Sequence, residues 1–271
     1  MTALYIILGL LVVICGGYLL MIRCRKGHPG LKDLQGWSYA HRGLHGNGIP
    51  ENSMTAFRLA LEKGYGIELD VHLMKDGTLA VIHDASLLRT AGVDVKIEEL
   101  CKEDLEQYRL EGTDEKIPLF DQVLELFEGK APMIIELKAH GNAAALTEAV
   151  ANRLERYKGV FCLESFDPRC IYWLKKNRPQ LIRGQLAENY SKNEKRHVSA
   201  VLEFILTHQL PNFLTVPDFV AYRFADRNLL GVTLARKVWG AQGVTWTIKS
   251  QEDHDTAVSE GFLPIFEGFE P

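Results

Sequence analysis

The segments WSYAHRG (37–43), GIELDV (66–71) and LAVIHD (79–84) organise the rest of the chain. Each contains an apolar run bounded by glycine or polar residues, and each ends in side chains that can bind or move charge. Apolar runs this short are typical of buried strands rather than of helices. These segments therefore predict strands that present histidine, arginine and carboxylate groups at their C-terminal ends.

The second segment places two carboxylates on one face of its strand. Glu68 and Asp70 are separated only by Leu69, and side chains along a strand alternate between its faces. Two carboxylates aimed in one direction repel each other, and a divalent cation that prefers oxygen ligands, Mg2+ or Ca2+, removes that repulsion. The alternative is an exposed strand edge with solvated charges, which the flanking Ile67 and Val71 argue against.

Several motifs in this part of the chain resemble, in order and spacing, the signature of glycerophosphodiester phosphodiesterases. They are His41-Arg42-Gly43, Pro50-Glu51-Asn52-Ser53, Glu68-Leu69-Asp70-Val71 with Lys75-Asp76-Gly77, and His83-Asp84. A lone His-Arg-Gly is a weak signal, whereas the ordered set is specific. The resemblance covers about residues 37–271.

A further predicted strand, Met133 to Leu137, carries Glu136, and Lys138 follows on the same face. From this strand alone, the two side chains could form a purely structural ion pair. The run Ile135-Glu136-Leu137-Lys138 also resembles the third metal-ligand motif of the family, which favours a functional interpretation. The resemblance thus implies that Glu68, Asp70 and Glu136 hold one divalent cation, Mg2+ or Ca2+.

The remaining charged groups have the chemistry that cleavage of a phosphodiester requires. His41 and His83 can exchange protons because histidine titrates near neutrality, and the sequence leaves open which is the acid and which the base. Arg42 can bind a phosphate oxygen through two hydrogen bonds, and Lys138 adds a point charge. The resemblance implies that both histidines are essential and that a glycerol hydroxyl beside the phosphate attacks first.

Other residues are candidates for the wall of the pocket. Glu51 and Asn52 are expected to brace or line it through the first loop. Trp246 resembles the substrate-lining tryptophan of the family, with plain core packing as the alternative, and Phe166 is a weaker candidate of the same kind. His72 lies on the Asp70 face by alternation, but we expect it beyond the end of the strand.

Strand and helix patterns alternate through the rest of the chain. We predict helices at 54–63, 118–129, 142–157, 168–177, 195–208, 225–239 and 251–260, and later strands at 160–164, 181–186, 213–220, 243–248 and 262–266. Eight of these strand candidates, separated by helices, predict a TIM (β/α)8 barrel of parallel strands with its site at the C-terminal strand ends. The alternative, a doubly wound open sheet, needs a glycine-rich phosphate loop that the sequence lacks.

Two regions depart from a regular barrel. Residues 85–117 are polar and rich in turns, so we predict a small insertion after the second strand, with a solvated charged helix face rather than a binding patch. The resemblance implies that this segment lies over the barrel mouth. After residues 262–266 the family's last helix is not evident, which puts barrel closure and the far rim of the pocket in doubt. No predicted ligand lies there.

The N-terminal segment Thr2 to Ile22 has no charged residue and is long enough to cross a bilayer core of about 30 Å as a helix. Arg23, Arg25 and Lys26 follow it, so the positive-inside rule places the catalytic domain in the cytoplasm. A cleaved signal and a core helix are the alternatives. We therefore divide the chain into a single-pass membrane anchor (1–23), a linker (24–36) and a barrel domain (37–271).

Composition limits the class of protein. A formal net charge of −4 gives no electrostatic footprint for nucleic acid, and the five cysteines show no metal-ligand spacing and suit a reducing compartment. The resemblance implies a phosphoric diester hydrolase that converts glycerophosphodiesters to an alcohol and sn-glycerol 3-phosphate. The alternatives are a membrane-associated phosphodiesterase acting on lysophospholipids or phosphoinositides, and an inactive membrane-tethered binding protein.

Overall fold

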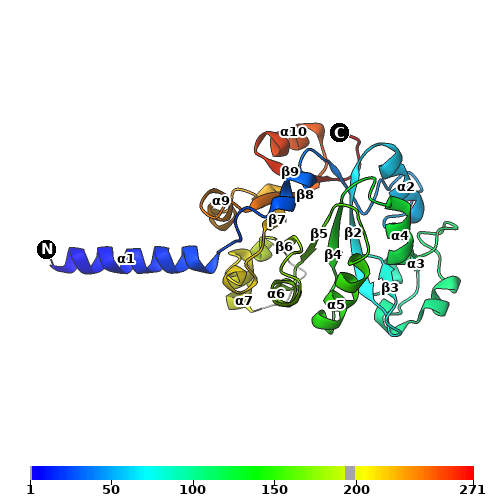
Figure 1. Ribbon diagram of the computed structural model, residues 1–271, viewed down its shortest axis with the longest axis horizontal. Helices are drawn as coiled ribbons and strands as arrows, with labels where there is room; N and C mark the ends of the chain where they lie inside the picture. The colour runs from blue at the N-terminus through cyan, green and yellow to red at the C-terminus, as the bar shows by residue number, and fades with distance from the viewer. Residues whose placement is uncertain (1, 193–198) are drawn as a thin grey trace.

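The computed structural model describes residues 2–192 and 199–271, and its centre is a closed parallel barrel (Figure 1). Its eight parallel strands are β1 (Tyr39–His41), β2 (Gly66–Leu73), β4 (Met133–Leu137), β5 (Phe161–Ser165), β6 (Arg183–Ala187), β7 (Phe219–Arg223), β8 (Gln242–Ile248) and β9 (Phe262–Phe266). Each strand pairs with its neighbour in parallel, and β1 pairs with both β2 and β9. The predicted TIM barrel is confirmed.

Barrel closure does not depend on a helix after the last strand. Tyr39 of β1 pairs with Ile265 of β9, and Ala40 pairs with Phe266. The doubt that the sequence raised about closure is therefore wrong, because the strand ladder alone joins the two edges. The chain after β9 turns back against the barrel, where the ring of Phe269 packs edge-on against Phe266 with 5.7 Å between ring centroids.

The predicted strand at 79–82 lies outside the barrel as β3 (Leu79–Val81), antiparallel to β2. This pairing extends β2 beyond the barrel, to Leu73, and matches His72 with Ala80. His72 therefore lies within the strand and is fully buried, contrary to our expectation that it lies past the strand's end. The physical reason is the second ladder, which satisfies backbone groups that the barrel alone would leave unpaired.

Helices cover the outside of the barrel. They include α2 (Met54–Glu62), α4 (Phe120–Phe127), α5 (Ala143–Leu154), α6 (Pro168–Asn177), α7 (Ala200–Thr207), α8 (Asn212–Thr215), α9 (Leu230–Lys237) and α10 (Gln251–Ser259). The predicted strand at 213–220 is corrected, since its first residues form α8 and β7 begins only at Phe219. Residues 195–198 of the predicted helix 195–208 lie outside the described residues.

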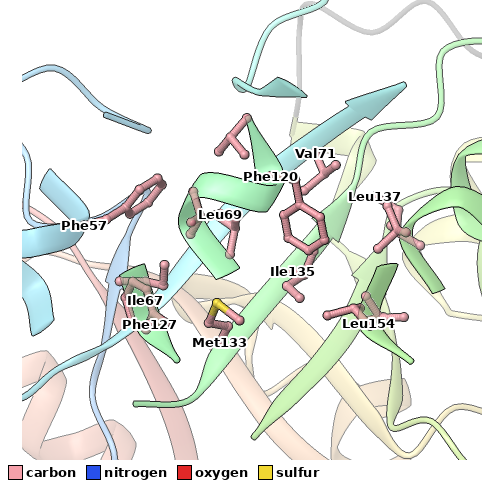
Figure 2. Packing of buried hydrophobic residues seen from close by; sticks show 14 of the residues in the cluster. Phe57, Ile67, Leu69, Val71, Phe120, Phe127, Met133, Ile135, Leu137 and Leu154 are labelled. Atoms are coloured by element: carbon pink, nitrogen blue, oxygen red, sulfur yellow. The ribbon is translucent and has the colours of Figure 1, made fainter. Parts of the chain in front are cut away.

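Alternation along the strands separates two apolar layers. Ile67, Leu69 and Val71 of β2 point outward and pack with Phe57 of α2 and Phe120 of α4 (Figure 2). A second layer fills the barrel interior, with Tyr39, Ile134, Cys162, Phe219, Val244 and Ile265 among its members. Because Leu69 faces the helices, the residues on either side of it must face the interior.

Residues 85–117 form a small unit beside β3. It contains α3 (Leu88–Ala91) and the 3-10 turns η2 (Ile97–Glu99) and η3 (Lys102–Gln107). Leu87, Ile97 and Leu105 are buried with Ile82 in a core separate from those of the barrel. In Figure 1 this unit lies on the side of the barrel away from the N-terminal helix.

The N-terminal helix α1 (Thr2–Met21) extends away from the barrel (Figure 1). Its mean hydropathy is 2.5 and none of its length is buried, so by length and composition it is a candidate membrane span. This exposure excludes the core-helix alternative. Its last turns meet the barrel, where Trp239 Nε1 donates to the Leu19 carbonyl oxygen at 2.9 Å.

Candidate active site

Three buried carboxylates converge at the C-terminal end of β2 and β4. Glu68 and Asp70 belong to β2, and Glu136 on β4 is the register partner of Asp70. One oxygen from each of the three side chains lies within 4.8 Å of the others, and all three residues are at most 6% exposed. The structure thus brings together the three residues predicted as metal ligands.

Two cationic side chains lie against these carboxylates. Lys138 Nζ is 3.0 Å from Asp70 Oδ1 and 2.8 Å from Glu136 Oε1. The Arg42 backbone N–H donates to Glu68 Oε2 at 3.1 Å, and its Nε is 3.4 Å from Asp70 Oδ2. Three negative and two positive groups leave this buried cluster with a formal charge of −1 when all five are ionised.

The pKa values of the three carboxyl groups reflect this excess of negative charge. Burial, together with the charges of Asp70 and Glu136, raises the pKa of Glu68 well above its usual value. Burial also raises the pKa of Glu136, to about 7. Burial acts in the same direction on Asp70, but Lys138, His83 and Arg42 outweigh it and hold that pKa well below its usual range. The cluster therefore has to bind protons or a cation, and its all-oxygen donor set fits Mg2+ or Ca2+.

The first loop braces this cluster from outside. Arg42 Nη1 donates to Glu51 Oε1 at 2.9 Å, and Asn52 Nδ2 donates to Asp70 Oδ2 at 2.8 Å. Gly43 has a φ of +79° and lies so close to α2 that an added Cβ would be 2.9 Å from Ala56. Only glycine fits there, which explains the third residue of the His-Arg-Gly motif.

His41 and His83 each have a carboxylate next to the Nδ1 atom of the ring. His41 Nδ1 is 2.6 Å from Glu267 Oε2, and His83 Nδ1 is 2.6 Å from Asp84 Oδ1. Because an ionised carboxylate only accepts, the proton of each neutral ring resides on Nδ1 and leaves Nε2 with a free lone pair. Both histidines line a cavity of about 210 Å³ together with Glu68 and Glu136.

Burial lowers the pKa of both His41 and His83, and their carboxylate partners oppose this shift only in part. The hydrogen bond from His41 in turn lowers the pKa of Glu267 to about 2. The pKa of Asp84 is lowered as well, mainly by its hydrogen bonds from Arg89 and His83 acting against burial, so each imidazole keeps an ionised carboxylate at Nδ1. Such a pair can take up a proton at Nε2 and stabilise the resulting cation.

The insertion contributes Arg89 of α3 to this network. Its guanidinium donates to Asp84, the partner of His83, and to Glu51 Oε1 at 2.7 Å, the partner of Arg42. One side chain thus connects a histidine pair with the arginine at the cluster. The sequence gave no indication of this contact, because the charged residues of the insertion cluster at 98–104 and Arg89 lies before that cluster.

Aromatic and aliphatic side chains form the opposite wall of the cavity. Phe166 and Trp246 meet edge to face with 5.8 Å between ring centroids, and Leu186 and Ile265 line the same cavity. Trp246 Nε1 is buried and makes no hydrogen bond within the residues described. His72 lies behind this site, where its Nε2 is 3.1 Å from the His83 carbonyl oxygen.

Sequence reasoning missed three acidic residues of the cavity and its edge. Glu164 on β5 is the register partner of Glu136, and burial and the Glu136 charge raise its pKa well above the usual value. Glu188 follows β6 and lines the cavity. The alternation that identified Glu136 also holds for Glu164, whereas Glu267 lies where the sequence departs from the family pattern, so no motif indicated it.

A second cavity of about 520 Å³ adjoins the first. His83, Glu136 and Phe166 line both cavities. At its other end the larger cavity is bounded by Tyr190 and by Leu206 of α7. The candidate site is therefore extended toward the α7 side of the barrel.

Comparisons with known proteins give matches in both sequence and fold. A sequence model described as the glycerophosphoryl diester phosphodiesterase family matches residues 41–266. The putative glycerophosphodiester phosphodiesterase YhdW of Bacillus subtilis is 38% identical over 223 residues, which cover 79% of this chain and 86% of that protein. A glycerophosphodiester phosphodiesterase of Caldanaerobacter subterraneus is 30% identical, with 82% of this chain and 89% of that protein covered.

Other relatives match over a shorter region. Lysophospholipase D GDPD1 of Rattus norvegicus is 37% identical over 132 residues, which cover 44% of this chain and 41% of that protein. The match thus spans less than half of this relative's length. The solved structure of an Oleispira antarctica phosphodiesterase in complex with sn-glycerol-3-phosphate has a TM-score of 0.71 and 22% identity, covering 88% of this chain and 94% of that one. This likeness shows the barrel fold.

Proposed function

The chain belongs to the glycerophosphoryl diester phosphodiesterase family, and we propose that it hydrolyses glycerophosphodiesters to an alcohol and sn-glycerol 3-phosphate. The observation that carries the proposal is the meeting of two carboxylate-paired histidines and three buried carboxylates at one cavity. A phosphodiester needs positive charge at its non-bridging oxygens and proton transfer at its two reacting oxygens. The cavity offers groups for both.

The carboxylate cluster is the proposed cation site. Glu68, Asp70 and Glu136 would hold one Mg2+ or Ca2+, which when bound neutralises charge on the phosphate oxygens. Arg42 and Lys138 lie against the same cluster and supply the remaining positive charge. Glu51 and Asn52 act through Arg42 and Asp70, which they hold in place.

The histidine pairs are the proposed acid and base. One Nε2 takes the proton of the attacking hydroxyl, and the other imidazole, protonated, gives a proton to the departing alkoxide. Glu267 and Asp84 stabilise the imidazolium that forms on each side. The two pairs are alike in distance and partner type, so the same site can exchange the two roles in a second step.

In the proposed route, the glycerol hydroxyl next to the phosphate attacks phosphorus and the bond to the alcohol breaks. The product is a cyclic phosphate, which water then opens to sn-glycerol 3-phosphate. A substrate that lacks the neighbouring hydroxyl should therefore not react. Normal turnover of such a substrate would contradict this route while leaving the hydrolase proposal intact.

A second candidate function is a membrane-associated lysophospholipid phosphodiesterase. Two observations favour it: the 520 Å³ cavity next to the site gives room for a larger alcohol, and α1 is long and apolar enough to span a bilayer. The basic residues Arg23, Arg25 and Lys26 follow α1, and by the positive-inside rule they support a cytoplasmic barrel in this proposal. In this proposal α1 is a single-pass anchor.

A substrate panel tests these proposals. The purified full chain is incubated with soluble glycerophosphodiesters and with lysophospholipid vesicles, with and without chelator, and release of the alcohol is measured. We expect chelator-sensitive release of alcohol together with sn-glycerol 3-phosphate. Absence of turnover on every substrate in added Mg2+ or Ca2+ would instead favour an inactive binding protein.

A further inference from the structure

The end of α1 is held against one side of the barrel. The Arg25 guanidinium pairs with the buried Asp218. The backbone N–H of Arg25 donates to the Pro217 carbonyl oxygen at 2.8 Å. Trp239 donates to the Leu19 carbonyl oxygen, and α1 also contacts α8. The side of the barrel that faces the proposed span therefore carries α8, and α7 and α9 lie beside the end of α1 in Figure 1.

This side exposes large apolar residues. They are Val201 (70% exposed), Leu202 (41%) and Phe204 (57%) on α7, and Phe213 (46%) and Leu214 (47%) on α8. We call these five residues the α7–α8 face. Soluble surfaces rarely gather apolar side chains of this size in one place without a partner.

The α7–α8 face is continuous with α1. The ring of Tyr18, near the end of α1, meets His208 with 6.5 Å between ring centroids, and His208 meets Phe204 at 4.4 Å. Three rings, in one edge-on and one tilted contact, thus connect the proposed span to the middle of α7. An apolar surface that begins at a membrane span lies at the height of the bilayer interface, where aromatic side chains are favoured.

Basic side chains border this surface. Arg23 directly follows the last turn of α1 and is exposed. The Nζ of Lys175 donates to the Leu214 carbonyl oxygen at 2.6 Å, which places an ammonium group directly beside α8. Apolar residues bordered by lysine and arginine match a bilayer surface with anionic headgroups.

The same helix reaches the candidate site. Leu206 is one turn beyond Leu202 on α7 and lines the 520 Å³ cavity, whose other end is formed by His83 and Glu136. One helix thus carries three residues of the α7–α8 face and a residue that lines this cavity.

We propose that the α7–α8 face docks on the surface of the bilayer that α1 crosses, so that the larger cavity opens toward lipid headgroups. The inference rests on the proposed role of α1 as an anchor. A single helix would leave the barrel free to tilt, and the docked face fixes its orientation. A second copy of this chain is the other possible occupant of the face, and the experiment below distinguishes the two.

Fluorescence quenching by lipids tests the docking. An environment-sensitive dye is attached through Phe204→Cys or Phe213→Cys in the full chain, after Cys15→Ser and Cys101→Ser remove the accessible native thiols. The matched control is Leu88→Cys, because Leu88 is 57% exposed on α3, on the far side of the barrel from α1 (Figure 1). The labelled chains are reconstituted in vesicles of phosphatidylcholine and phosphatidylglycerol containing a lipid with a quencher on its acyl chain.

We expect quenching at positions 204 and 213 and none at position 88. Equal absence of quenching at all three positions, while the chain stays in the vesicles and hydrolyses glycerophosphocholine, would overturn the docking. If the dye moves into an apolar environment only when more protein is packed into each vesicle, and the lipid does not quench it, the face would bind a second copy of the chain. Release of the chain from the vesicles at alkaline pH would overturn the anchor and the docking together and leave the hydrolase proposal standing. If Phe204→Cys misfolds, Val201→Cys reports on the same helix.

Discussion

The mouth of the barrel has two unlike halves. The strands β1, β2 and β4 carry His41, Glu68, Asp70 and Glu136, which form one charged network with Arg42 and Lys138. The strands β6, β8 and β9 contribute Leu186, Trp246 and Ile265 to the same cavity. We call these the charged half and the apolar half. Under the proposed function, the charged half would act on the phosphate and the apolar half would bind the organic part of the substrate, both held by one rigid scaffold.

The largest expected effect lies in the charged half. His41→Ala should lower kcat by about a thousandfold, because it removes one of the two proton-transfer groups. Steady-state hydrolysis of a glycerophosphodiester measures the change. The matched control is His28→Ala, since His28 Nε2 bonds the Gln180 carbonyl oxygen on the outside of the barrel. Similar rates for the two variants would remove His41 from the mechanism.

The next largest effect is expected from Glu267, which follows β9 and pairs with His41 of the charged half. Glu267→Gln keeps the side-chain shape but removes the charge that raises the pKa of His41. We expect kcat to fall by about tenfold to a hundredfold. The limb of the pH–rate profile that belongs to His41 should move to lower pH, because an imidazole without its carboxylate binds a proton less tightly.

The control for this variant is Glu270→Gln. Glu270 pairs with Lys63 at 3.0 Å on the surface, and about half of each side chain is exposed. It should change neither kcat nor the pH profile. An unshifted profile for Glu267→Gln would show that Glu267 has only a structural role.

A smaller effect is expected in the apolar half. Trp246→Ala removes the ring that meets Phe166 and should raise KM by about tenfold, with a smaller change in kcat, because the lost contact concerns binding rather than proton transfer. Trp173→Ala on α6 is the control, since Trp173 packs against Arg178 away from the cavity. If kcat instead falls by a larger factor than KM rises, Trp246 contributes to the chemical step as well as to substrate binding.

The smallest effect separates stability from catalysis. Ser53 Oγ accepts from the Ala56 N–H at 3.1 Å and caps α2 behind the charged half. Ser53→Ala should lower the free energy of unfolding by about 1 kcal/mol, as loss of an N-cap does, and change kcat less than twofold. Denaturant unfolding and activity of the same preparation check this, with exposed Ser259→Ala as the control. A tenfold drop in kcat would instead place Ser53 within the catalytic network.

The charged half could be predicted from the sequence because its chemistry is local. Glu68 and Asp70 share a face by the period of the strand, and the parallel neighbour of β2 brings Glu136 beside them. The register itself, in which Asp70 faces Glu136, is not visible in the sequence. His72 was misplaced because the pairing of β2 with β3 depends on chain folding beyond the strand.

Other features of the molecule were harder to predict because they depend on contacts between distant parts of the chain. Glu267 reaches His41 only because β9 closes against β1, across 226 residues of sequence. Phe213 and Leu214 suggested a strand by their apolar character, yet they lie exposed on α8. Apolar residues predict burial only when the partner belongs to the same folded unit, and the proposed partner here is a bilayer.

The central claim is that Glu68, Asp70 and Glu136 form a cation site. Calorimetric titration of the full chain in detergent with Mg2+ and with Ca2+, compared with Glu136→Gln, tests it most directly. We predict binding of one ion per chain and release of protons at pH 7, because burial raises the pKa of Glu136 to about 7 and the ion requires the carboxylate form. Glu136→Gln should bind the ion at least about tenfold more weakly. Equal binding by the two proteins, or no binding by the unmodified chain, would contradict the account.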